Sequence, residues 1–307
     1  MHERADSQDA RLLDCSELQR VLHSLKHFTR VDSDAALFPI LLYLPVYFKM
    51  YGILESIDLI ITLREEKATR SMTPSSSVLL PPGGQRILFV LAHPDDAEFL
   101  CGGTVALLAE EGRAIQYLLV TRGDKGSDEP AMTPELLAPL REQEQRHAAE
   151  TLGVQTVTFL EGYYDGEVEP SLTLRREIAF VVRQWKPDAV FTFDPWRRNE
   201  VHPDHRAVGI CTLDALACAR GAMYYPEQLS NGVTPHNARH IYYFSTDQAN
   251  HWVDITGVVE KKVAAARCHE SQTKHMDLEA WVRRRGNIAG VEHKYTCAEA
   301  FHHYVMG

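Results

Sequence analysis

The sequence predicts an α/β protein with a Rossmann-like, mostly parallel sheet and helices on both faces. Short apolar runs rich in β-branched and aromatic residues alternate with longer segments that have helical spacing. Near-continuous apolar strands separated by helices are typical of parallel sheets that are covered on both faces. At 307 residues, the chain is also long enough to bury a large core.

The first predicted elements are delimited by glycines and prolines. The continuous apolar run Ile87–Ala92 predicts a strand that ends at a proline-containing turn. A helix at Thr104–Glu111 follows a pair of glycines, and the next apolar run, Ala114–Thr121, predicts the second strand. Pro134–Leu152 has helical spacing, a proline at its first position and a glycine at its end. Thr156–Leu160 predicts the third strand.

The same alternation continues to the C-terminus. Leu172–Trp185 predicts a helix that stops before a proline, and Asp188–Phe193 predicts the fourth strand. A helix from Pro203 to about Arg220 begins with proline, and the strand His240–Ser245 follows it. The last predicted helices are Val258–His269 and Asp277–Arg285.

A break in composition near residues 71–84 separates an N-terminal extension from the main domain. Serine, proline and glycine dominate this stretch, as in linkers. We therefore predict a mainly helical extension at residues 1–71 and a main domain at residues 72–307. The extension has no chemical motif. It is interpreted as an oligomerisation element or lid, as an appendage packed on the main domain, or as a segment preceding a natural start at Met72.

Composition excludes several classes of protein. The formal net charge of −10 argues against nucleic acid or an anionic membrane as a partner. The most apolar stretch, Ala36–Phe48, is shorter than the roughly 20 residues of a membrane span. The six cysteines form no C-x-x-C pair, and no secretory signal is visible. We expect a cytoplasmic protein with reduced thiols, and a homo-oligomer is compatible with the sequence.

The strongest chemical signal follows the first predicted strand. His93-Pro94-Asp95-Asp96 stands at its carboxyl end, where open α/β sheets bind ligands. His93 and Asp96 can converge on one cation, which leaves Asp95 as a base. Adjacent carboxylates raise each other's pKa unless each has a partner. The alternative is that Asp95 or Asp96 only caps the following helix.

A second motif, His202-Pro203-Asp204-His205, follows the fourth predicted strand. Proline suits the first turn of a helix, so both imidazoles can face one pocket, and Asp204 can orient an imidazole. Two histidines, a carboxylate and an open position are typical of catalytic zinc. The same ligands occur in 2-His-1-carboxylate iron enzymes. The extra Asp95 favours hydrolysis, and no G-x-S-x-G nucleophile motif is present.

Together, the two motifs resemble the signatures of the PIG-L/LmbE-like zinc-dependent N-acetylglucosaminyl deacetylases. The resemblance runs from about residue 85 to the C-terminus. It also takes in Gly102-Gly103-Thr104, the helix that contains Arg141 and Glu144, the Asp165-Gly166 turn and the segment from Lys261 to Gln272. It implies that residues 72–307 form a deacetylase domain.

The resemblance implies one Zn²⁺ per chain, bound by His93, Asp96 and His205, although another divalent metal would also suit these ligands. It makes Asp95 the general base toward a metal-bound water. That water would attack the amide of an N-acetylglucosamine-type sugar or conjugate and release the acyl group.

The resemblance also implies roles around the metal. His202, oriented by Asp204, would stabilise the oxyanion or protonate the leaving amine, while Arg141 and Asp165 would contact the sugar. An iron enzyme and a catalytically silent sugar-binding protein remain the alternatives.

The sequence departs from the family's pattern at two positions. Ala97 stands where many members have Glu, and Glu98 follows it. Glu200 stands where some members have a Tyr that helps to hold the oxyanion. Oxyanion stabilisation would then depend on the zinc, on His202 or on a residue that the sequence does not identify.

Overall fold

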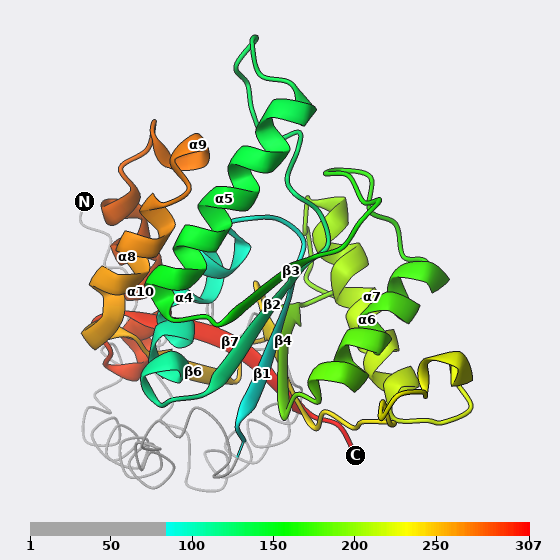
Figure 1. Cartoon of the computed structure of the whole chain (residues 1–307). Helices are drawn as coiled ribbons and strands as arrows, with labels where there is room; N and C mark the ends of the chain where they lie inside the picture. The colour runs from blue at the N-terminus through cyan, green and yellow to red at the C-terminus, as the bar shows by residue number, and fades with distance from the viewer. Residues whose placement is uncertain (1–83) are drawn as a thin grey trace, which may run out of the picture. The chain divides into compact units, whose positions relative to one another are not determined.

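The computed structural model describes residues 84–307, which form a seven-stranded mixed sheet between two layers of helices (Figure 1). The strand order is β3-β2-β1-β4-β5-β7-β6. The first five strands in this order are parallel, whereas β7 is antiparallel to both β5 and β6. The strands are β1 Arg86–Leu91, β2 Ala114–Leu119, β3 Thr156–Phe159, β4 Ala189–Phe193, β5 His240–Phe244, β6 His251–Asp254 and β7 Ala298–Val305. The predicted fold class is confirmed, but the sequence analysis missed β6 and β7.

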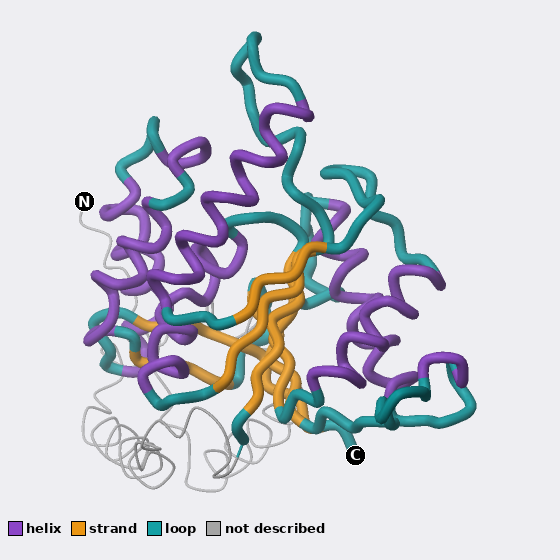
Figure 2. Tube along the Cα trace, viewed as in Figure 1, coloured by secondary structure: helices purple, strands orange, loops and turns teal. Residues whose placement is uncertain are grey.

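Helices cover both faces of the sheet (Figures 1 and 2). One layer contains α4 Asp96–Glu110, α5 Pro134–Leu152, α8 Val259–Arg267 and α10 Leu278–Gly290, and α8 contacts the other three. The opposite layer contains α6 Leu172–Trp185 and α7 Pro203–Ala219, which pack on each other. A short helix, α9 Glu270–Thr273, follows α8.

Helix α4 differs from its prediction at its start. The sequence analysis placed this helix at Thr104–Glu111, but α4 begins at Asp96 and is interrupted by non-helical backbone at Cys101 (φ −147°, ψ 19°). The break lies just before the glycine pair that precedes the predicted helix. Gly103 is needed there because a Cβ atom at this position would lie 2.7 Å from Ile255.

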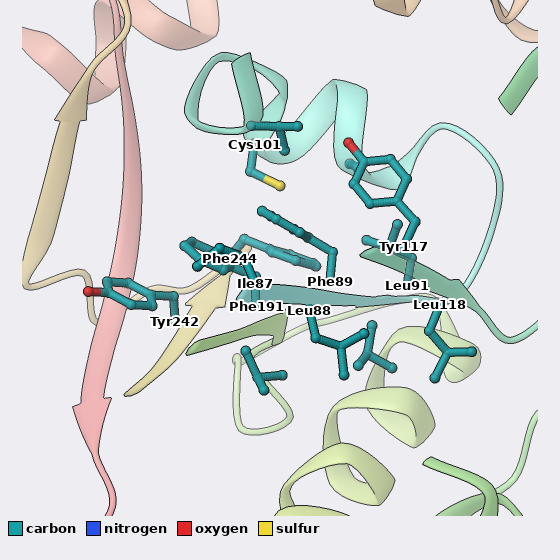
Figure 3. Packing of buried hydrophobic residues seen from close by; sticks show 14 of the residues in the cluster. Ile87, Leu88, Phe89, Leu91, Cys101, Tyr117, Leu118, Phe191, Tyr242 and Phe244 are labelled. Atoms are coloured by element: carbon teal, nitrogen blue, oxygen red, sulfur yellow. The ribbon is translucent and has the colours of Figure 1, made fainter. Parts of the chain in front are cut away.

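The strand β1 is the rigid support for the turn that follows it. All of its residues except Arg86 are fully buried. Phe89 stacks on Phe191 of β4, with ring centroids 4.6 Å apart, and meets Tyr117 of β2 edge-on at 5.6 Å. Figure 3 shows Phe89 and Tyr117 on the face toward α4 and Leu88 on the opposite face. Each such side chain contributes about 1.5–3 kcal/mol by burial.

The chain order reverses between β1 and β4, which are neighbours in the sheet. In open α/β folds, a crevice for ligands forms at this switch point, outside the carboxyl ends of the strands. The turn after β1 and the loop after β4 therefore meet at one end of the sheet.

The predicted N-terminal extension, including Ala36–Phe48 and the boundary at residue 71, lies outside the described residues. None of the helices within residues 84–307 combines the length and the hydrophobicity that a membrane crossing needs.

Candidate active site

Asp96 links the two histidine- and aspartate-containing motifs of the sequence, residues 93–96 and 202–205, by contacting one histidine from each. Its Oδ1 lies 3.3 Å from Nε2 of His205, and its Oδ2 lies 3.7 Å from Nδ1 of His93. Oδ2 also accepts the backbone N–H groups of Ala92 at 3.0 Å and His93 at 2.7 Å, so the carboxylate is held in place. The structure thus brings the three predicted metal ligands into contact.

His202 joins this group from the N-cap position of α7. Its ring centroid lies 4.4 Å from that of His93 and 4.8 Å from that of His205. One ring nitrogen from each of these three histidines lies within 4.8 Å of the others, an arrangement that could hold a metal ion. Nδ1 of His202 accepts the backbone N–H of Asp204 at 3.3 Å. A neutral His202 therefore carries its proton on Nε2.

Two further carboxylates surround His93. Its Nε2 lies 2.9 Å from Oδ2 of Asp204 and 3.2 Å from Oδ1 of Asp165. Asp204 also accepts backbone N–H groups from Gly166 and Val168, at 2.7 and 3.1 Å. The carboxylate of Asp204 was expected to orient His202, but it contacts His93, and only its backbone N–H reaches His202. Asp165 lies inside the histidine cluster, with Oδ1 3.6 Å from Nε2 of His202.

The electrostatics of the cluster call for a positive charge among the carboxylates. Burial by itself lowers the pKa of His93, but hydrogen bonds to Asp165 and Asp204 raise it to about 10. Burial by itself raises the pKa of Asp96, but the neighbouring His205 and His93 lower it to about 2. A protonated His93 supplies the charge, and a divalent cation bound to neutral imidazoles would supply it equally well. Imidazole nitrogens and a carboxylate are ligands that zinc accepts, so the residues fit such an ion.

Asp95 has a strained backbone, and its carboxylate pairs with an arginine. Its φ of 97° lies in the left-handed region, which costs a non-glycine residue about 1–3 kcal/mol. Its N–H donates to Oε1 of Gln145 at 2.9 Å, and its Oδ2 accepts Nη2 of Arg141 at 3.0 Å. Burial raises the pKa of Asp95 to about 6, although the charge of Arg141 opposes this shift. Backbone strain and a raised pKa in one residue are typical of a functional site.

Arg141, expected to contact a sugar, lies behind Asp95. Its side chain is only 4% exposed. Besides Asp95, its guanidinium donates to the carbonyl oxygens of Pro94 at 2.6 Å and Gly123 at 2.8 Å. These contacts fix the turn that carries Asp95.

Comparison with known proteins decides the family. The family described as "PIG-L: GlcNAc-PI de-N-acetylase" matches residues 88–216. The chain is 34% identical over 197 residues to a protein of Thermococcus kodakarensis named diacetylchitobiose deacetylase, covering 64% of this chain and 73% of that protein. The chain belongs to the PIG-L family. It thereby joins a group of proteins that includes named N-deacetylases.

Other members of the PIG-L family have the same fold but not always the same named reaction. The structure of N,N'-diacetylchitobiose deacetylase from Pyrococcus horikoshii superimposes with a TM-score of 0.69 and 30% identity, covering 73% of this chain and 84% of that one. A Pseudomonas putida protein named 4-oxalmesaconate hydratase is 27% identical over 197 residues, covering 60% of this chain and 73% of that protein. The reaction must therefore be argued from the site itself.

The PIG-L chain also contains a buried network behind Asp95 that sequence reasoning did not assign. Nε2 of Gln145 lies 3.1 and 3.2 Å from the two oxygens of Glu98, and Nε2 of His269 lies 3.2 Å from Oε2 of Glu98. All three side chains are fully buried. Gln145 comes one helical turn after Arg141, so their shared helix face was the signal available in the sequence.

Proposed function

We propose that this PIG-L protein is a zinc-dependent hydrolase that removes an acetyl group from the amide of an N-acetylglucosamine-type sugar or conjugate. The observation that carries this proposal is the contact of Asp96 with both His93 and His205, next in sequence to Asp95 with its strained backbone. The substrate class is supported by the names of the Thermococcus and Pyrococcus relatives, which act on diacetylchitobiose.

His93, Asp96 and His205 would hold the metal. When bound, zinc polarises the amide carbonyl and lowers the pKa of water. Asp165 and Asp204 engage the other ring nitrogen of His93, as carboxylates commonly do for metal-binding histidines. They restrict the ring to one orientation, with Nδ1 toward Asp96.

Asp95 would take the proton from the attacking water. With a pKa of about 6, it is ionised at neutral pH and is a stronger base than an ordinary aspartate. Its ion pair with Arg141 fixes the direction of the carboxylate. We therefore propose that Arg141 supports Asp95, and its contact with the sugar stays a prediction.

His202 would stabilise the developing negative charge on the carbonyl oxygen or protonate the departing amine. The backbone N–H of Asp204 occupies Nδ1 of His202, which leaves Nε2–H as a donor. The side chain is 37% exposed, so a substrate can reach it. Asp165 lies next to it and could accept a hydrogen bond from a sugar hydroxyl.

An acetate-release assay tests the proposal. We expect the zinc-loaded protein to release acetate and a free amine in equal amounts from diacetylchitobiose or another N-acetylglucosamine conjugate. Asp95→Asn serves as the matched control because it removes the base and adds no bulk. A protein that binds these sugars but releases no acetate would be a silent member of the family, and the proposal would be wrong.

Two other reactions are separated by simple variants of the same assay. Acetate release by zinc-loaded protein in the absence of oxygen would exclude the iron-enzyme alternative. Hydration of 4-oxalmesaconate without any acetate release from acetylated sugars would instead assign the chain to the reaction named for the Pseudomonas relative.

A further inference from the structure

Glu200 lies on the opposite side of the His205 ring from Asp96. Nε2 of His205 is 3.3 Å from Oδ1 of Asp96, and Nδ1 is 3.3 Å from Oε1 of Glu200. One imidazole thus bridges two carboxylates. We propose that Glu200 is a positioning residue that holds the proton of His205 on Nδ1 and thereby directs the lone pair of Nε2 toward the metal. This inference rests on the metal site of the proposed function.

The ring of His205 needs this contact because stacking alone leaves its direction open. Phe193 stacks on His205 with ring centroids 4.0 Å apart and an interplanar angle of 15°. Stacking fixes the plane of the imidazole, but a half-turn of the ring about the Cβ–Cγ bond would keep that plane and place Cδ2 and Cε1 where Nδ1 and Nε2 lie. The carboxylate of Glu200 favours the ring orientation that offers it Nδ1 instead of Cδ2, because it accepts an N–H. It also favours the tautomer with the proton on Nδ1, because it repels a lone pair.

Glu200 is itself held firmly enough to orient another group. Its Oε2 accepts Nη1 of Arg197 at 2.6 Å, and the same nitrogen of Arg197 donates to Oγ of Ser245 at 2.8 Å, just after β5. Its Oε1 also accepts the backbone N–H of His202 at 3.3 Å. The Glu200 side chain is 9% exposed. These contacts tie the carboxylate to the end of the sheet.

Zinc affinity of the metal-free protein, measured by competition with a chelator, tests this role. We expect Glu200→Leu to weaken zinc binding about 10–100-fold, the usual range for such partners of metal-binding histidines. Glu200→Gln should weaken it less, because its amide oxygen still accepts the Nδ1–H. Glu227→Gln is the matched control, since Glu227 pairs with Arg176 on the surface. Wild-type affinity in Glu200→Leu would overturn the proposal.

A double-mutant cycle separates positioning from a merely structural role. In a His205→Cys background, where a thiolate can still bind zinc, replacing Glu200 should cause no further loss of zinc affinity, because the ring that it orients is gone. Equal losses in both backgrounds would mean that Glu200 only supports the loop, and the proposal would be wrong. Zinc binding is measured without substrate. If Glu200→Leu bound zinc more weakly but the zinc-loaded wild-type protein released no acetate, the proposed function would be refuted. The role of Glu200 in zinc binding would still stand.

Discussion

Replacing Gln145 by Met should destabilise the protein, because it removes the hydrogen bond that the side chain of Gln145 accepts from the N–H of Asp95. Met has nearly the same volume as Gln, so the packing should change little. Gln145 is fully buried and connects the N–H of Asp95 to the carboxylate of Glu98. Its loss leaves the N–H without its partner and removes one donor from a buried carboxylate that His269 still contacts. A buried polar group left unsatisfied costs about 1–3 kcal/mol. The sum for the two groups is roughly 2–6 kcal/mol.

Thermal and urea unfolding measure this loss. For a domain of this size, 1 kcal/mol shifts Tm by about 2–4 °C, so we expect a fall of roughly 4–24 °C. Gln143→Met on the same helix is the control because Gln143 is exposed, and such surface changes stay within about 0.5 kcal/mol. The turnover of Gln145→Met should also fall, since Asp95 loses a restraint on its left-handed backbone. If Gln145→Met and Gln143→Met unfold alike, the buried network does not support the turn.

The remaining predictions concern the base, the acid and the N-terminal extension. Asp95→Asn should keep the metal but lower kcat by two or more orders of magnitude, and a near-wild-type rate would remove its role as base. His202→Ala should act similarly, mainly on kcat rather than KM. A protein starting at Met72 should retain its metal and some acetate release. A folded, metal-loaded protein of this kind without any activity would show that residues 1–71 help to build the site.

The sequence predicted the parallel part of the fold because its strands are continuous apolar runs. The antiparallel strand β7 was missed because its sequence, Ala-Glu-Ala-Phe-His-His-Tyr-Val, contains polar residues whose partners are distant. Glu299, for example, is buried against Nζ of Lys262 at 2.6 Å and accepts the backbone N–H of Gly103 at 2.9 Å. No local pattern indicates that this carboxylate is paired.

In the candidate site too, features formed by adjacent residues could be predicted, whereas contacts formed by folding could not. The turn with Asp95 and the helix start with His205 could be predicted because each is encoded by adjacent residues. The contact of Asp204 with His93 depends on how the turn after β1 and the start of α7 fold against each other. The contact of Glu200 with His205 depends on how the loop after β4 folds against the first turn of α7. The sequence marked Glu200 only as a departure from a family pattern, whereas the structure gives it a partner.

Reconstitution of metal-free protein with zinc is the most direct test of the central claim. We expect acetate release from a good substrate to be lost on chelation and to rise in proportion to added zinc until one ion is bound per chain. Alanine at His93, Asp96 or His205 should abolish this rise by removing a ligand. Full acetate release from the metal-free protein, or unchanged zinc binding in all three variants, would contradict the proposed site.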